Sequence, residues 1–201
     1  MSHPYRVTVT HCTEETLSSE DYTQCKIDLT PILPEDRMKS ILEQTLEENG
    51  WTHDQERDVW VKERENGERV EINVDDLTCT TFIEIEGSIS KSKTVNAAGD
   101  NWNGKNIEEE RKRLEDKVRS SLERELKISE TEKQKKQEEL SHQASNHLKN
   151  SEEARNKELN EVLVETYSHA LQEKAKSLGE ITEISESKNE NEYELIIKIK
   201  S

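Results

Sequence analysis

The longest uninterrupted element of the sequence runs from Asn106 to Leu178 and contains neither Pro nor Gly. Glu, Lys, Arg, Gln, Leu and Ala fill most of its positions, and these residues lose the least free energy on entering a helix. At 1.5 Å per residue, the stretch predicts a helical rod of roughly 100 Å or a helical hairpin of half that length. Because a chain of 201 residues cannot bury such a helix, the helix must project, fold back or pair with a partner.

The composition limits the rest of the chain to a small core. Charged residues make up 37% and hydrophobic residues 29% of the sequence, which is too little apolar material for one large core. The excess of 45 acidic over 29 basic residues gives a net charge of -16 and argues against non-specific binding to nucleic acid or anionic membranes. No window approaches the roughly 18 apolar residues that a membrane-spanning helix needs. We expect a small folded head with a solvated helix.

The three cysteines, Cys12, Cys25 and Cys79, have no paired spacing, and no apolar signal-peptide core follows the initial methionine. We therefore expect a cytoplasmic protein with free thiols. His11 and His53 are further ligand-type residues, but no C-x-x-C or H-x-x-x-H spacing joins them to the cysteines. The sequence predicts no metal, no cofactor and no small-molecule substrate.

Alternation of apolar and polar residues predicts short strands around one helix in the first half of the chain. Tyr5 to His11 and Cys25 to Leu29 have strand-like patterns, and a polar loop separates them. Four apolar residues then recur at helical spacing between Glu35 and Glu48, and Asn49-Gly50 follows them. This pattern predicts one amphipathic helix that packs on the sheet.

The clearest local signal is Asn66-Gly67, which lies between two alternating runs. Asn-Gly suits a type I′ turn, and a two-residue loop would place Val61 opposite Ile72 in a β-hairpin. Another strand is expected from Thr80 to Glu86. The segment from Ser88 to Gly104 has the composition of a flexible connector.

Two apolar stripes divide the expected long helix, one in its first third and one in its last third. The absence of Gly and Pro near the centre favours a continuous helix. A polar turn at Ser145-Asn146 or Asn150-Ser151 would instead give an antiparallel hairpin that pairs the stripes. The spacing is coiled-coil-like but does not hold a strict heptad.

The last segment predicts a second β-hairpin. Gly179 is placed to end the long helix, and Ile181 to Ile184 and Tyr193 to Ile199 then show strand patterns. Because a lone hairpin is marginal in water, we expect it to join the head sheet or the sheet of a second subunit.

The sequence therefore predicts an α+β fold with a small, mostly antiparallel sheet and one packing helix, plus a long charged helix or helical hairpin before the C-terminal β-hairpin. The expected parts are an α+β head (residues 1–87), a flexible linker (88–104), the long helix or helical hairpin (105–179) and the C-terminal hairpin (180–201).

No motif supports catalysis, since no phosphate-binding glycine loop, nucleotide fingerprint or lipase-type elbow occurs. Acidic runs and histidines on the long helix fit solvated helix faces. Aromatic residues are enriched at interface hot spots, and the apolar stripes are candidate contact surfaces. The candidate partner contacts are Trp102, Tyr167, Leu114, Val118, Leu122 and Leu163.

The segment from Leu163 to Gly179 carries Tyr167 and small residues, and strand patterns follow it at Ile181 to Ile184 and Tyr193 to Lys200. This arrangement, together with an opening Met-Ser-His before a strand, resembles a small uncharacterised family found in cyanobacteria, plastids and other bacteria. In that family a helix with a Tyr ends in a Gly and precedes a two-stranded hairpin with an acidic turn. The resemblance implies an accessory protein working beside AAA+ ATPases of bacterial multi-component systems, and it carries over no catalytic residue.

The expected function is a non-enzymatic protein–protein interaction or scaffold module that binds a protein partner, or a second copy of itself, through the long helix. A self-assembling structural subunit is one alternative. Another is a thiol or metal site, which requires the histidines and cysteines named above to converge. The residues of that alternative are His11, Cys12, Cys25, His53 and Cys79.

Overall fold

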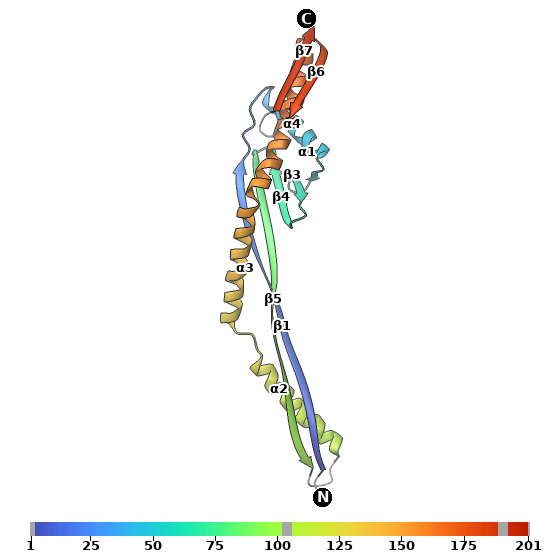
Figure 1. Ribbon diagram of the computed structural model, residues 1–201, viewed down its shortest axis with the longest axis vertical. Helices are drawn as coiled ribbons and strands as arrows, with labels where there is room; N and C mark the ends of the chain where they lie inside the picture. Colours follow the sequence, from blue (N-terminus) through green and yellow to red (C-terminus); the bar gives the residue numbers. More distant parts are fainter. Residues whose placement is uncertain (1–2, 102–105, 189–192, 201) are drawn as a thin grey trace. The chain divides into compact units, whose positions relative to one another are not determined.

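The computed structural model describes residues 3–101, 106–188 and 193–200, and these residues form an α+β protein (Figure 1). Its strands are β1 (His3–Lys26), β2 (Thr52–Asp54), β3 (Val59–Glu63), β4 (Glu68–Asn73), β5 (Thr78–Asn101), β6 (Glu180–Lys188) and β7 (Tyr193–Lys200). Its helices are α1 (Glu35–Glu48), α2 (Ile107–Glu125), α3 (Glu130–Asn150) and α4 (Glu152–Leu178). None of these helices is both long and apolar enough to span a membrane.

The chain divides into two compact units, each with its own hydrophobic core. Unit 1 consists of Met1–Ser19 and Ile85–Gln143, and unit 2 consists of Glu20–Glu84 and Ala144–Ser201. A five-stranded antiparallel sheet has the order β1-β5-β4-β3-β2, and β1 and β5 contribute residues to both units. The predicted α+β class, the mostly antiparallel sheet and the helix from Glu35 to Glu48 are confirmed.

The core of unit 2 forms where α1 and α4 cover the sheet. Along β4, buried and half-buried residues alternate, so that one face of the strand carries Glu68, Val70 and Ile72. Ile72 packs with Leu42 of α1 and Val162 of α4 in one cluster of buried side chains. Burying each such side chain contributes about 1.5–3 kcal/mol.

The β3–β4 hairpin forms, but its predicted register is wrong by one residue. Trp60, and not Val61, lies opposite Ile72. Because side chains alternate across a strand, this shift gives Trp60 the face that had been predicted for Val61. Trp60 accordingly packs against the core of unit 2.

The predicted two-residue turn is also wrong, and the turn explains the register. The Arg64 carbonyl accepts the Gly67 N–H at 3.0 Å, and the Arg64 N–H donates to the Glu68 carbonyl at 2.8 Å. Gly67 takes a φ of 83°, whereas Asn66 uses its side-chain Oδ1 to accept the Glu68 N–H at 3.2 Å. The loop is therefore a three-residue turn with a left-handed glycine, which is the next most common hairpin connection.

Two long strands replace the polar loop and the flexible linker that the sequence predicted. β1 is one strand from His3 to Lys26, and β5 continues past Gly87 to Asn101. The flexible linker is thus wrong for residues 88–101, while the remainder of that segment, including Trp102, lies outside the described residues.

Cross-strand contacts explain why polar and glycine-containing sequence forms these strands. The Thr8 hydroxyl donates to Asn96 Oδ1 at 2.7 Å across the pair. Gly99 lies under the Tyr5 ring, where an added Cβ would collide with Tyr5 Cζ. Gly99 therefore permits a close aromatic approach in a strand instead of making a turn.

Unit 1 gains its core from the first apolar stripe of the predicted long helix. α2 lays this stripe on β1 and β5, where the buried and half-buried cluster includes side chains from all three elements. The cluster consists of Val7, Val9, Leu122 and Leu126, with Tyr5, Val95, Leu114 and Val118 packed against it.

The single helix predicted from Asn106 to Leu178 is wrong, because it breaks after α2 and is interrupted again before α4. At the first break Ser129 caps α3, where its Oγ accepts the Glu132 N–H at 3.3 Å and the Glu132 carboxylate accepts the Ser129 N–H at 2.9 Å. This reciprocal capping box stabilises a new helix start. Ser151 separates α3 from α4, although its N–H still donates to the His147 carbonyl at 3.1 Å.

The alternative helical hairpin is not formed either. Its two apolar stripes have other partners: the first packs on β1 and β5 in unit 1, and the last packs on the sheet and on α1 in unit 2. The long strands β1 and β5, which the sequence analysis did not predict, form the surface on which the first stripe packs.

The C-terminal hairpin forms as predicted, but its described strands do not join the head sheet. β6 and β7 pair antiparallel in a separate two-stranded sheet, which packs against α4 within unit 2. Gly179 allows this approach, because an added Cβ would lie 2.7 Å from Ile199 Cγ2 and from the Lys200 carbonyl oxygen. α4 therefore supports the hairpin in place of further strands.

Candidate functional site

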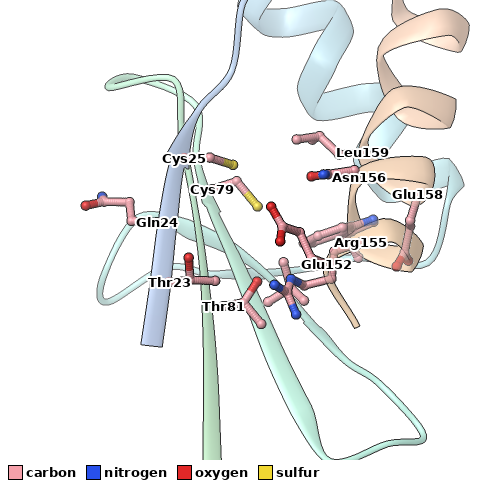
Figure 2. Close-up of a pocket in the computed structure, with 12 residues that line it drawn as sticks. Thr23, Gln24, Cys25, Cys79, Thr81, Glu152, Arg155, Asn156, Glu158 and Leu159 are labelled. Atoms are coloured by element: carbon pink, nitrogen blue, oxygen red, sulfur yellow. The ribbon is translucent and has the colours of Figure 1, made fainter. Parts of the chain in front are cut away.

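A small cavity in unit 2 lies between the strands of the sheet and the first turns of α4 (Figure 2). Its volume is about 80 Å³, which is room for a few water-sized molecules. The residues that line it are Thr23, Gln24, Cys25, Trp51, Val70, Cys79, Thr81, Glu152, Arg155, Asn156, Glu158 and Leu159.

Two cysteines from different strands meet at this cavity. The Ile27 N–H donates to the Leu77 carbonyl at 2.8 Å, and the ring centroids of Tyr22 and Phe82 lie 6.0 Å apart across the same strand pair. Both contacts fit one antiparallel register, which places Cys25 directly opposite Cys79. In Figure 2 both thiols point to the side of the strands on which α4 lies.

The two thiols differ in their surroundings. Cys25 is exposed, whereas Cys79 belongs to the buried core. Burial raises the pKa of Cys79 to about 12, and the neighbouring Cys25 acts in the same direction. The positive charge of Arg155 has a smaller opposite effect. Cys79 thus stays protonated near neutral pH, and its sulfur is shielded.

Arg155 is held at the edge of the cavity by a buried polar network. Its Nη1 donates to Glu68 Oε1 at 3.0 Å, and its Nη2 donates to the Leu148 carbonyl at 2.7 Å near the end of α3. Arg64 and Ser151 also donate to the Glu68 carboxylate. The network joins the β3–β4 hairpin to the junction between α3 and α4.

Glu68 is completely buried and remains ionised within this network. Burial alone raises its pKa, but hydrogen bonds from Ser151, Asn66 and Arg64 and the charge of Arg155 outweigh burial, so that its pKa is lowered. Sequence reasoning missed this residue, although the alternation Glu68, Val70, Ile72 carried the signal. The network fixes the positions of its side chains, and their hydrogen bonds occupy the Glu68 carboxylate.

The predicted thiol and metal candidates do not assemble into one site. Cys25 and Cys79 come together in unit 2, whereas His11 and Cys12 belong to unit 1. His53 instead contacts Asp58 Oδ1 through Nε2 at 3.0 Å. Among the residues that the structure describes, no group of three or more His, Cys, Asp or Glu side chains is arranged to hold a metal ion.

The predicted partner contacts that can be located serve mainly in packing. Leu122 is buried, and Leu114 and Val118 pack beside it in unit 1. Leu163 packs against the core of unit 2. The Tyr167 hydroxyl donates to the Asp28 carbonyl and accepts the Thr30 N–H, both at 2.9 Å, which fastens the segment after β1 to α4.

The exposed apolar surface lies elsewhere, toward the end of the chain. Among the described residues, most of the large apolar side chains that are exposed belong to the second half of α4 and to the β6–β7 hairpin. These side chains are together called here the hairpin surface, although Ile184 and Ile199 lie on one face of the hairpin and Ile196 lies on the other. They are Leu171, Leu178, Ile184, Ile196 and Ile199.

A groove of about 380 Å³ lies between α4 and the β6–β7 hairpin, next to the hairpin surface. Carboxylates of Glu161, Glu165 and Glu186 line it together with Tyr193 and His169, and its described lining contains no Lys or Arg. The groove therefore presents negative charge beside exposed apolar side chains.

Comparison with known proteins places the chain in a family. No curated protein and no solved structure matches it significantly. The family model described as FtsH ternary system domain X5 matches residues 1–201, which is the whole sequence given. The chain therefore belongs to the FtsH ternary system domain X5 family.

Proposed function

We propose that the chain is a non-enzymatic accessory module of an FtsH-linked system, and that it binds a protein component of that system through the hairpin surface. Membership of the FtsH ternary system domain X5 family supports the setting, because FtsH is an AAA+ ATPase and a ternary system implies protein partners. The observation that carries the proposal is the exposed apolar surface on α4 and the β6–β7 hairpin.

The strands of the hairpin support this choice of surface. β6 and β7 form a sheet of two strands, so each has one edge whose backbone N–H and C=O groups lack a strand partner among the described residues. Such an edge accepts an added strand from another protein, with main-chain hydrogen bonds giving affinity and side-chain pockets giving specificity. A strand added at the β7 edge would lie beside exposed Ile196, and one added at the β6 edge would lie beside exposed Ile184.

Charge indicates the chemistry of the partner. The groove beside the hairpin is lined by Glu161, Glu165 and Glu186, and the whole chain carries a net charge of -16. A partner segment that combines apolar residues with Lys or Arg is complementary to this surface. Long-range attraction would speed its association and make that association sensitive to salt.

The non-enzymatic part of the proposal rests on how the polar groups of the cavity are used. Arg155 and Glu68 bond to each other, to Ser151 and to a main-chain carbonyl. Their roles are therefore structural, and none of these bonds leaves a pre-organised acid, base or nucleophile pair.

The test is a binding titration of the full chain against the purified FtsH-type ATPase and the other proteins of the same system. Ile184→Glu places a charge beside the β6 edge and Ile196→Glu places one beside the β7 edge. The substitution at the edge that binds the partner should weaken binding at least tenfold, because hot-spot losses exceed about 1.4 kcal/mol. Ile107→Glu is the matched control: Ile107 is 40% exposed, close to the 43% of Ile184, but lies at the start of α2 in unit 1.

The control should bind within about twofold of the wild type. Binding that survives both hairpin substitutions, or that falls equally with the control, would overturn the hairpin surface as the docking site. If none of the system's proteins binds the wild-type chain, the proposed module has no partner in that system and the proposal fails.

One observation favours self-association as a second candidate. The outward face of β7 carries Glu194, Ile196 and Lys198 in alternation. If two copies pair their β7 edges antiparallel about Ile196, each Glu194 lies opposite the Lys198 of the other copy. Opposite charges directly across a strand pair contribute about 0.2–1 kcal/mol.

A charge swap tests this pairing by sedimentation of the full chain over a range of concentrations. Glu194→Lys should weaken a dimer, and the double variant Glu194→Lys with Lys198→Glu should restore it. Lys198 also pairs with Glu183 within the chain at 2.6 Å, so the double variant is compared with Glu183→Gln, which should not affect the dimer. A wild-type chain that sediments as a monomer at every concentration contradicts this candidate.

A further inference from the structure

We propose that Cys25 and Cys79 form a modification site, at which a hydroperoxide converts two facing thiols into an intramolecular disulfide. This inference is independent of the proposed protein-binding function, because it rests on the cavity in unit 2 and not on the hairpin surface.

The strand geometry suits such a bond. The register set by Ile27 with Leu77 and by Tyr22 with Phe82 places Cys25 opposite Cys79. Directly opposite residues of an antiparallel pair have Cα atoms about 4.5–5.5 Å apart, which is within the roughly 4.4–6.8 Å that disulfides span.

Both thiols also lie on the same side of the strands, toward α4 (Figure 2). The bond therefore needs side-chain rotation and only small backbone movement.

The two thiols are suited to different steps. Exposed Cys25 is accessible to an oxidant, whereas Cys79 is buried and, with its pKa raised to about 12, stays protonated. Because an oxidant in solvent reaches exposed Cys25 and the buried Cys79 thiol stays protonated, Cys25 reacts first and Cys79 second. Cys79 is the nearest thiol to the oxidised Cys25.

The cavity indicates the class of oxidant. Its volume of about 80 Å³ is enough to hold hydrogen peroxide beside both thiols. Trp51 Nε1 lines the cavity and is buried without a hydrogen-bond partner among the described residues, so it is a donor for a small polar molecule. The lining also holds Arg155 and the carboxylates of Glu152 and Glu158, so the cavity suits an uncharged oxidant. Hydrogen peroxide is small, uncharged and able to accept this hydrogen bond.

The Cys25 thiolate attacks one oxygen of hydrogen peroxide, the O–O bond breaks, and Cys25 becomes a sulfenic acid while hydroxide leaves and takes up a proton as water. The Cys79 thiol then transfers its proton to the oxygen of the Cys25 sulfenic acid as its sulfur attacks the Cys25 sulfur, so that the S–O bond breaks and a second water leaves. The two thiols lose two electrons, and the peroxide gains them.

The test is oxidation of the full chain with hydrogen peroxide after removal of reductant. Intact mass under non-reducing conditions should fall by two hydrogen atoms, and peptide mapping should link the Cys25 and Cys79 peptides. Dithiothreitol should restore the original mass. The cross-link should also raise the unfolding midpoint temperature of the oxidised chain by several degrees, because it restricts the unfolded state.

Cys12→Ser is the matched control, since Cys12 is an exposed thiol of β1 in unit 1. This variant should form the disulfide as the wild type does. In Cys79→Ser, Cys25 should stop at the sulfenic acid, which a dimedone probe captures at least several-fold more than in the wild type. Cys25→Ser changes an exposed residue, so it keeps the fold, and it should form no disulfide.

Three results would overturn the site. They are overoxidation of Cys25 to a sulfinic acid without a link, disulfides that form only between chains, and dimedone labelling that does not rise in Cys79→Ser. Loss of protein binding in the titration described above has no bearing on these readouts, so failure of one proposal is distinguishable from failure of the other.

Discussion

Glu68→Gln removes one negative charge from the interior of unit 2 and leaves the side-chain size unchanged. Glu68 is fully buried and accepts hydrogen bonds from Arg64 Nη1 at 2.9 Å and Arg155 Nη1 at 3.0 Å. Bonds to a charged group contribute about 1.5–3 kcal/mol each, and neutral bonds about 0.5–1.5 kcal/mol. With two such bonds weakened and a smaller desolvation cost for Gln, we expect the free energy of unfolding to fall by about 2–3 kcal/mol.

Urea unfolding followed by tryptophan fluorescence measures this loss. Trp51 lies in the core of unit 2 and Trp60 packs against it, so both report on this unit, and a Trp102→Phe background keeps the signal specific. Glu63→Gln is the control in the same hairpin, because the Glu63 side chain is 68% exposed and should contribute less than about 0.5 kcal/mol. A Glu68→Gln chain as stable as this control would refute the role assigned to the network.

The pH dependence gives an independent check on Glu68. Burial raises its folded-state pKa, but the hydrogen bonds and the Arg155 charge outweigh burial, so the pKa lies below 4.5. A group with a lowered folded pKa contributes stability above its unfolded pKa and loses it as pH falls through the folded pKa. The stability difference between wild type and Glu68→Gln should therefore be full above pH of about 4.5 and narrow below it. If this stability difference instead grew as the pH fell, the Glu68 pKa could not be lowered in the folded state.

Further substitutions and one pH titration test the parts of the fold that the sequence did not reveal. Gly99→Ala should lower the thermal unfolding midpoint of unit 1, because the added Cβ meets the Tyr5 ring. In a double-mutant cycle, the addition of Tyr5→Ala should reverse part of this decrease. Ser129→Ala should cost about 1 kcal/mol of unfolding free energy and fray the start of α3 in hydrogen exchange. Hydrogen bonds from Lys91 and Ser129 lower the pKa of Glu132 from 4.5 to about 2. The ionised Glu132 side chain therefore stabilises the fold above pH 4.5, and this stabilisation is lost as the pH falls toward 2. Leu122→Ala should cost about 2–5 kcal/mol in urea unfolding, and a loss under 1 kcal/mol would show that α2 does not pack on the strands.

Local patterns predicted those elements whose partners are close in sequence. The helix from Glu35 to Glu48 matches its prediction at both ends, because its apolar spacing and the following Asn49-Gly50 are local signals. The β3–β4 and β6–β7 hairpins were also expected. The register of the first was not predictable from Asn-Gly alone, since Gly67 with positive φ serves either turn type.

Long-range pairing explains most of the errors. Residues 88–101 resemble a linker in isolation, and only the pairing of β5 with β1 makes a strand of them. The break before α3 did carry a local signal, the Ser129 and Glu132 capping box, which the helix-forming composition around it obscured. Cys25 and Cys79 are far apart in sequence, and only the strand register brings them together.

Hydrogen exchange of the full chain, alone and in complex with the FtsH-type ATPase or another protein of the system, tests the central claim most directly. Binding through the hairpin surface predicts new protection of main-chain amides in β6 and β7, residues 180–188 and 193–200, with little change in α2. Protection confined to α2 or to the unit 1 part of β1 and β5, with β6 and β7 unchanged, would contradict the claim and move the interaction to unit 1.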